Sequence, residues 1–291
     1  MFKDCHPVVN LIYFTFVLVI TMFSNDPIFI GLSLIAAWSY SLALKGKGTM
    51  KNNLLLTLPI FVIMALINTL FTHNGATTLF YINNARITLE ALIFGIMGAA
   101  ILTSIVIWFI CFSEIMTSDK LIFVFGKARP VMGLTMSMIF RFIPLLRERF
   151  REIRMGQKSM GRIEETKFTG KVRQFAKEVS ILISWSLESA IETSDSMEAR
   201  GYGLKGRTSF SLFKMTSKDK RILIWTIITG ILPTIAMIMG ITDIYYYPKF
   251  IFGEWNLLRI ATFVSYLLLV VTPIFIDIFE NRKWQLLKQE I

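Results

Sequence analysis

Six long apolar runs are the feature that most constrains how this chain can fold. They lie at about residues 8–23, 27–44, 54–71, 91–112, 222–240 and 257–279. A helix of roughly 20 apolar residues spans the ~30 Å hydrocarbon core of a bilayer, and tilt or snorkelling accommodates somewhat shorter runs. Because a helix satisfies its backbone polar groups within its own segment, we predict an all-α membrane protein with about six transmembrane helices.

The runs divide the chain into three parts. Residues 1–112 would hold the first four membrane helices, residues 222–291 the last two and a tail, and residues 113–221 lie between the fourth and fifth spans. Lys and Arg are enriched in cytoplasmic segments and therefore indicate orientation. With both termini in the cytoplasm, 28 of the 31 Lys and Arg residues fall on the cytoplasmic side. We predict this orientation, with residues 113–221 in the cytoplasm.

The remaining composition argues against several other classes of protein. The net charge of +11 suits either nucleic acid or a membrane surface, and the apolar runs favour the membrane, so no nucleic-acid partner is predicted. Two Cys and two His are too few for a soft-metal site, and no cofactor is predicted. There is no phosphate-binding loop signature, so we predict no ATP hydrolysis by this chain. The interiors of the apolar runs are nearly free of ionisable residues, with Arg259 near the start and Asp277 at the cytoplasmic end of the last run, which argues against an ion-coupled pump.

Two amphipathic helices are predicted within residues 113–221. In the first, at about 136–157, apolar residues recur every three or four positions and arginines occupy the other face. Pro144 should kink or interrupt it. A basic amphipathic helix of this kind often lies on an anionic membrane surface, and the sequence leaves open whether this one does. The second, at about 171–200, carries three acidic residues that favour a protein partner over a membrane: Glu188, Glu192 and Asp195.

The second amphipathic helix ends in a short motif that could bind a partner. Arg200 lies between Ala199 and Gly201, and small neighbours let a helix end approach another protein closely. A guanidinium in that position can pair with a carboxylate through two hydrogen bonds. It could instead only complement the dipole of its own helix, an effect of about 0.3–1 kcal/mol. Gly201 and Gly203 are well suited to ending the helix.

Several segments resemble the transmembrane T component of energy-coupling factor (ECF) transporters. One is Met197-Glu-Ala-Arg-Gly-Tyr-Gly203, preceded by Trp185-Ser-Leu-Glu-Ser-Ala-Ile191. Another is Arg141-Phe-Ile-Pro-Leu-Leu146, followed by Gln157 and Gly161. The His6-Pro7 opening and the apolar hairpin after it are also similar.

The resemblance implies a scaffold within an ATP-driven importer of vitamins or transition-metal ions in the plasma membrane of a prokaryote. Its partners would be two cytoplasmic ATPase subunits and a small substrate-binding membrane protein. Each of two cytoplasmic helices would end in an Ala-Arg-Gly-like motif that docks on one ATPase. The chain itself would be a non-catalytic subunit.

The two docking motifs match the family to different degrees. The second is complete, as Ala199, Arg200 and Gly201. In the first, Ser159, Met160 and Gly161 occupy the Ala-Arg-Gly positions, and Arg162 follows. Either Arg162 takes over the docking contact, or Met160 docks through apolar contact.

Two other functions are compatible with six apolar spans. An ordinary ATP-driven permease would line its own pathway, but its coupling loop carries a Leu-Pro element that is not found between Ala199 and the next span. A secondary transporter would act alone, and it usually has intramembrane charges and an internal repeat.

Overall fold

The computed structural model describes residues 2–46, 48–72, 75–82, 85–128, 130–160, 168–204, 213–242, 244, 246 and 256–289. These residues form two compact units: Met1–Thr117 together with Phe213–Ile291, and Ser118–Leu212. We call them the membrane unit and the helical arm unit. Each is described by itself.

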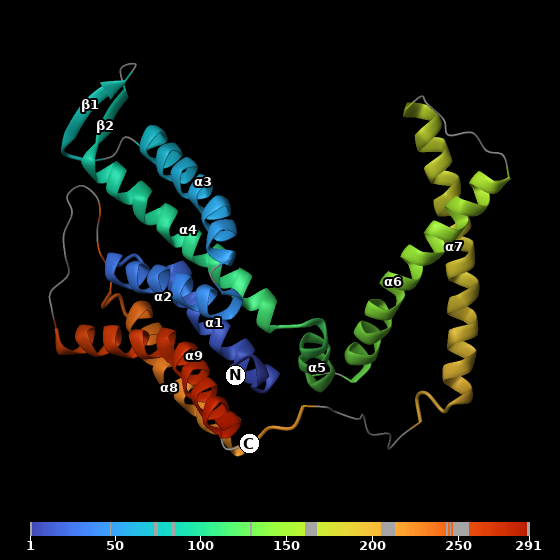
Figure 1. Ribbon diagram of the computed structural model, residues 1–291. Helices are drawn as coiled ribbons and strands as arrows, with labels where there is room; N and C mark the ends of the chain where they lie inside the picture. The colour runs from blue at the N-terminus through green and yellow to red at the C-terminus, as the bar shows by residue number, and fades with distance from the viewer. Residues whose placement is uncertain are drawn as a thin grey trace. The chain divides into compact units, whose positions relative to one another are not determined.

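All six apolar runs are helical in the membrane unit (Figure 1). After a 3-10 turn, η1 (Phe2–Asp4), the helices are α1 (Pro7–Phe23), α2 (Pro27–Lys45), α3 (Gly48–Phe71), α4 (Leu89–Ile115), α8 (Ser217–Ile238) and α9 (Leu257–Gln289). All but α1 are long and apolar enough to cross a membrane, and α1 is a shorter apolar helix of 17 residues. The prediction of an all-α, multi-pass membrane protein is confirmed.

A short β-hairpin between α3 and α4 was not predicted. Strands β1 (Thr78–Ile82) and β2 (Ala85–Thr88) pair antiparallel, and the second strand leads directly into α4. Thr88 is both the last residue of β2 and the N-cap of α4, its hydroxyl accepting a hydrogen bond from the Ala91 N–H. The hairpin thus sets where α4 begins.

Side-chain caps define where several helices of the membrane unit begin. His6 caps α1 and Asp26 caps α2, and each is followed by a proline at the first helical position. Thr216 and Asp219 form a reciprocal capping box at the start of α8. These caps satisfy amide groups that would otherwise lack partners at the helix starts.

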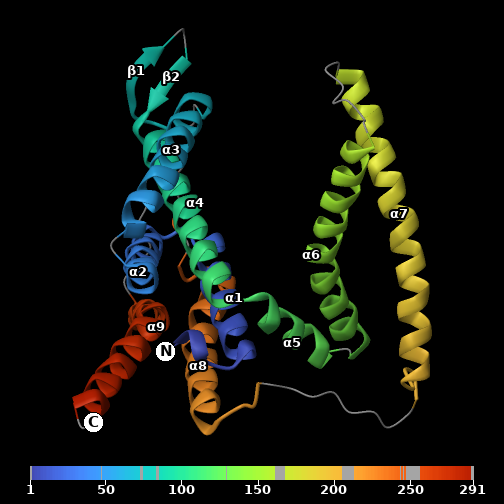
Figure 2. The ribbon, with the colours of Figure 1, turned by 45° about the vertical axis from the view of Figure 1, so that its right-hand side comes forward.

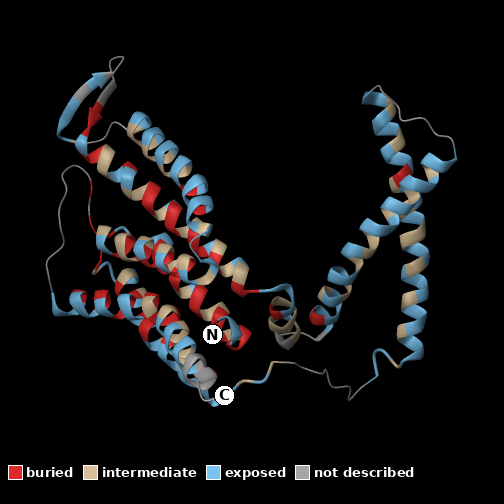
Figure 3. Cartoon of the chain, viewed as in Figure 1, coloured by how far each residue is buried: buried red, intermediate tan, exposed pale blue. Residues whose placement is uncertain are grey.

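The core of the membrane unit is built from aromatic side chains of α1, α2, α4 and α9. Trp108 is fully buried and its ring contacts those of Tyr13 and Phe14 edge-on, with centroids 6.2 Å apart in each pair. The Trp108 Nε1–H donates to Ser33 Oγ at 3.0 Å, and Thr21 bridges Ser33 to the Tyr266 hydroxyl. In Figure 3 the buried positions line the inward faces of these helices.

A buried ion pair joins α2 to α9 near one end of the bundle. Arg259 Nη2 lies 2.6 Å from Asp26 Oδ2, and the two side chains are only 2% and 0% exposed. The Arg259 guanidinium also lies over the ring of Phe263. Asp26 keeps its role as the α2 cap, since its other oxygen accepts from the Ile28 N–H. One carboxylate therefore fixes both a helix start and a contact between distant parts of the chain.

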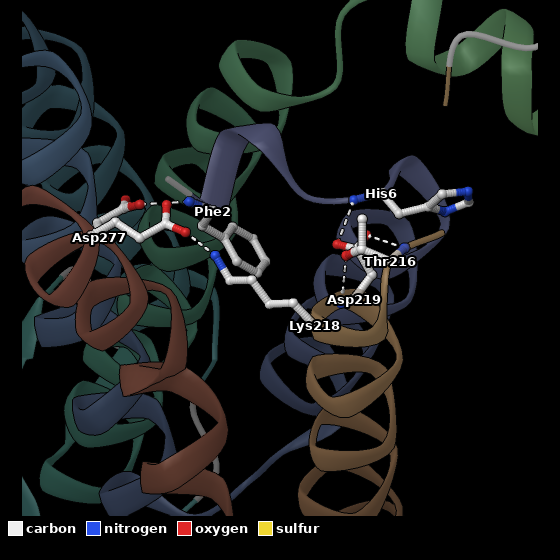
Figure 4. Close-up of polar contacts among 7 residues, drawn as sticks. Phe2, His6, Thr216, Lys218, Asp219 and Asp277 are labelled. Carbon is white, nitrogen blue, oxygen red and sulfur yellow. Dashed lines mark hydrogen bonds and ion pairs between the residues drawn. The ribbon is translucent and has the colours of Figure 1, made fainter. Parts of the chain in front are cut away.

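The first residues of the chain are held by carboxylates of α8 and α9 (Figure 4). The Phe2 N–H donates to Asp277 Oδ1 at 2.6 Å, and the His6 N–H donates to Asp219 Oδ1 at 3.1 Å. The Phe2 ring is fully buried and packs edge-on against Tyr13. These contacts anchor η1 and give each of the two carboxylates a hydrogen-bond donor.

The helical arm unit consists of α5 (Ser118–Ala128), α6 (Pro130–Ser159) and α7 (Phe168–Ala199). The helix predicted at 136–157 begins earlier, and it continues through Pro144 without interruption. Helices α5 and α6 approach closely at Gly126 and Gly133: a Cβ placed on Gly133 would lie 2.4 Å from the Gly126 Cα. Only glycine at these two positions permits so close an approach of α5 and α6.

Candidate functional site

The end of α7 has the backbone geometry of a Schellman motif. The Gly201 N–H donates to the Glu198 carbonyl at 2.8 Å, and the Tyr202 N–H donates to the Met197 carbonyl at 2.9 Å. Gly201 has φ +77°, a left-handed conformation that residues with a Cβ rarely adopt. The predicted helix stop at Gly201 is confirmed, and Arg200 is the C-cap residue.

The predicted docking residues at this end are accessible. Ala199 and Arg200 are both exposed, and the Arg200 N–H donates to the Ser196 carbonyl at 3.2 Å. A Cβ on Gly201 would lie 2.9 Å from the side chain of Leu204, which is itself 70% exposed. The cap consequently presents Arg200, Tyr202 and Leu204, all exposed, on a tight turn with glycines between them.

The end of α6 carries the incomplete first motif. Ser159 is the last residue of α6, and its hydroxyl donates to the Met155 carbonyl at 3.0 Å. Met160 follows in a turn and is 74% exposed, an unusual position for a large apolar side chain. Gly161 and Arg162 lie outside the described residues.

Helices α6 and α7 cross through a small set of contacts. Arg154 Nε lies 3.4 Å from Glu178 Oε2, and the Glu178 side chain is fully buried. The Arg149 guanidinium lies over the ring of Trp185, 5.0 Å from its centroid, and the rings of Phe150 and Phe175 meet edge-on.

These contacts change the interpretation of the arginine face. Arg149 and Arg154 belong to the arginines that the periodicity places opposite the apolar residues of this helix, yet both contact α7. Glu178 was not singled out from the sequence. Its position four residues after Gln174, whose amide donates to it at 3.2 Å, is the only local signal that could have identified it.

The two predicted docking motifs are not brought together. Arg154, near the end of α6, contacts Glu178, whereas Arg200 lies 22 residues further along α7. At 1.5 Å per residue this separation is about 33 Å. Figures 1 and 2 show the same arrangement, with the helices close near the end of α6 and apart at the end of α7. The helical arm unit therefore presents two separate helix ends.

Apolar side chains remain exposed between these ends. On α7, Ile183, Leu187 and Ile191 recur every four residues and are 54%, 63% and 64% exposed. Such spacing places them on one face of the helix. Exposed apolar stripes of this kind are typical of interaction surfaces.

Comparison with known proteins places the chain in a family. The family model described as CbiQ, a cobalt transport protein, matches residues 2–210, which include both helix ends and most of the spans. No curated protein matches the chain significantly. Because the match covers well over half of the 291 residues, the chain belongs to the CbiQ cobalt transport protein family, the family of the transmembrane T components of ECF transporters.

Proposed function

We propose that this chain is the non-catalytic transmembrane scaffold of an ECF-type importer that takes up a vitamin or a metal ion. The observation that carries the proposal is the exposed Arg200 on the glycine-capped end of α7. A Schellman cap satisfies the last carbonyl groups of the helix internally, which leaves the guanidinium available for a partner. Family membership supports a role in membrane transport.

The partners at the two helix ends would be two cytoplasmic ATPase subunits. One would bind the end of α7 through a carboxylate that pairs with Arg200, and the other would bind the end of α6. The 33 Å estimated along α7 is compatible with two separate docking sites. ATP binding would draw the ATPases together and move both helix ends, while hydrolysis stays on the ATPases.

The membrane partner would be a small substrate-binding protein that contacts the exposed surface of the scaffold. Helix α3 offers a large apolar surface, because Leu55, Ile63 and Leu66 are 76%, 57% and 55% exposed. Lipid would cover this surface when the partner is absent. Movement of the docked arms would then tilt or release the substrate-binding protein.

The proposed orientation has both termini in the cytoplasm of a prokaryotic cell. Ala76, before the β-hairpin, and Lys51, at the start of α3, are both exposed and lie at opposite ends of that helix. The native thiols of Cys5 and Cys111 are buried, so they contribute little background to thiol labelling. In intact cells an impermeant thiol reagent should modify Ala76→Cys and spare Lys51→Cys. Labelling in the opposite pattern would reverse the orientation.

The decisive experiment compares Arg200→Glu and Arg200→Ala with a matched control, Arg173→Glu. Arg173 is an exposed arginine near the other end of the same helix. Removing Arg200 from a desolvated pair should weaken ATPase binding by roughly 2–5 kcal/mol, with Glu worse than Ala. Co-purification with the ATPases and substrate uptake should both be lost, whereas the control retains them. Full uptake by Arg200→Glu at normal expression would rule out the coupling role.

The first docking contact is tested in the same assay. Met160→Glu should abolish co-purification of one ATPase if the exposed methionine docks by apolar contact. Arg162→Ala should have the larger effect if the arginine takes over. Normal assembly of both variants would show that the end of α6 is not a docking site.

A further inference from the structure

A groove lies between α8 and α9 of the membrane unit. Its volume is about 770 Å³, and both walls come from apolar helices that are packed against each other. Lys218, Ile222 and Trp225 of α8 lie three or four positions apart and so line one face of that helix. Leu268, Val271, Phe275 and Phe279 do the same on α9.

One end of the groove is basic. Lys218, Arg221 and Lys283 line it there, and Glu280 is the only acidic residue among the lining side chains. Lys218 forms an ion pair with Glu280, and Figure 4 shows Lys218 reaching across from α8. Arg221 and Lys283 are exposed, and neither has an ion-pair partner among the residues that the structure describes. Two positive charges therefore remain unneutralised at this end.

The rest of the groove is apolar and has the dimensions of one membrane leaflet. From Lys283 to Leu268 is 15 residues of α9, or about 22 Å, which is close to half of a ~40–45 Å bilayer with its headgroups. The Trp225 Nε1–H donates to the Thr272 hydroxyl at 3.2 Å, so this polar group is satisfied within the wall. The ring lies one turn from Arg221, and tryptophan is enriched at the boundary between headgroups and acyl chains.

We propose that this groove binds an anionic phospholipid. The phosphate would lie between Arg221 and Lys283, and an acyl chain would follow the apolar wall past Trp225 toward Leu268. A basic rim above an apolar groove is complementary to a lipid that carries net negative charge, and a zwitterionic lipid gains less from it. The bound lipid would fill the space between α8 and α9 at the end where the first residues of the chain are anchored.

The test is native mass spectrometry of the full chain in detergent, with phosphatidylglycerol and phosphatidylcholine of identical acyl chains added in equal amounts. The wild type should retain phosphatidylglycerol preferentially. Each basic side chain near the phosphate should raise the affinity for the anionic lipid about fivefold. Arg221→Gln combined with Lys283→Gln should therefore reduce phosphatidylglycerol retention roughly 25-fold. Phosphatidylcholine retention should change little. Lys51→Gln with Arg173→Gln removes the same charge outside the groove and should preserve the preference.

A second variant tests the groove itself. Val271 lines the wall and is partly buried, so Val271→Trp should fill the space and reduce retention of both lipids. Equal retention of the two lipids by the wild type would overturn the proposal, as would an unchanged preference in the Arg221→Gln/Lys283→Gln variant. Displacement of phosphatidylglycerol by millimolar inorganic phosphate would also overturn it, because the site would then recognise the free anion.

Discussion

The membrane unit and the helical arm unit are both helical, but they differ in what holds them together. In the membrane unit, side chains as large as Trp108, Tyr13 and Tyr266 are fully buried. In the arm unit, the buried residues among 118–126, 131–160 and 168–204 are Lys120, Gly133 and Glu178, and no large apolar side chain is among them. Figure 3 shows the contrast, with α6 and α7 exposed over most of their length.

This difference indicates how each unit acquires its shape. The membrane unit is specified by its own contacts, which in lipid are close packing and hydrogen bonds rather than the hydrophobic effect. The arm unit has a few cross-helix contacts and long exposed apolar faces, so we expect the positions of its helices to depend on what binds them. A unit of this kind suits a part that must move with a partner.

The largest effect is expected from the buried ion pair of the membrane unit. Arg259→Met leaves the Asp26 carboxylate buried and unpaired, which should lower the free energy of unfolding by about 3–5 kcal/mol. Unfolding in a graded detergent or denaturant series measures this loss. Adding Asp26→Asn should restore part of it, because asparagine removes the charge and still caps α2. Arg173→Met, on the exposed surface of α7, should change the stability by less than about 0.5 kcal/mol.

Alanine at two helical glycines should have opposite effects in the two units. A Cβ on Gly230 of α8 would lie 2.6 Å from the ring of Phe16, so Gly230→Ala should destabilise the membrane unit by about 1–3 kcal/mol. A Cβ on Gly156 of α6 would meet nothing within 4 Å, so Gly156→Ala should stabilise that helix by about 0.5–1 kcal/mol. Circular dichroism melts of both variants give the comparison. Destabilisation by Gly156→Ala would mean that α6 is packed more tightly than the contrast implies.

The smallest effect is expected at the crossing of α6 and α7. Arg154 is 63% exposed, so solvent screens its pair with Glu178. Glu178→Gln should therefore lower the free energy of unfolding by no more than about 1 kcal/mol. Spin labels at Gln157 and Val172 should nevertheless report a broader distance distribution between the helices. A distribution as narrow as that of the wild type would show that the aromatic contacts alone fix the crossing.

Local signals in the sequence predicted the helices well, because the start, length and end of a helix depend mainly on residues that are neighbours in the chain. The run at 27–44 became α2 with bounds one residue longer, and Gly201 ended α7 as its conformation requires. The β-hairpin was missed because its two strands are only five and four residues long and no Asn-Gly or Asp-Gly turn marks it.

Contacts between distant residues could not be predicted in this way. Arg259 and Asp26 are 233 positions apart, and nothing in either local pattern indicates the other. Glu178 and Arg154 each resemble a solvent-exposed charge on an amphipathic helix until the crossing is known. At the candidate site, the shape of the cap followed from glycine, whereas the docking of Arg200 on an ATPase stays a prediction.

The anchoring of η1 has a consequence for the order of events during synthesis. Membrane proteins are made from the N-terminus, and the hydrogen-bond acceptors of the His6 and Phe2 amides lie 213 and 275 residues downstream. At about 5–20 residues per second, the Asp277 carboxylate is made roughly 15–55 s after Phe2. Throughout that interval the Phe2 ring, fully buried in the finished protein, has only part of its pocket. A chain truncated before α9 lacks the Asp277 acceptor, so its first residues should be cut by proteases more readily than those of the whole chain.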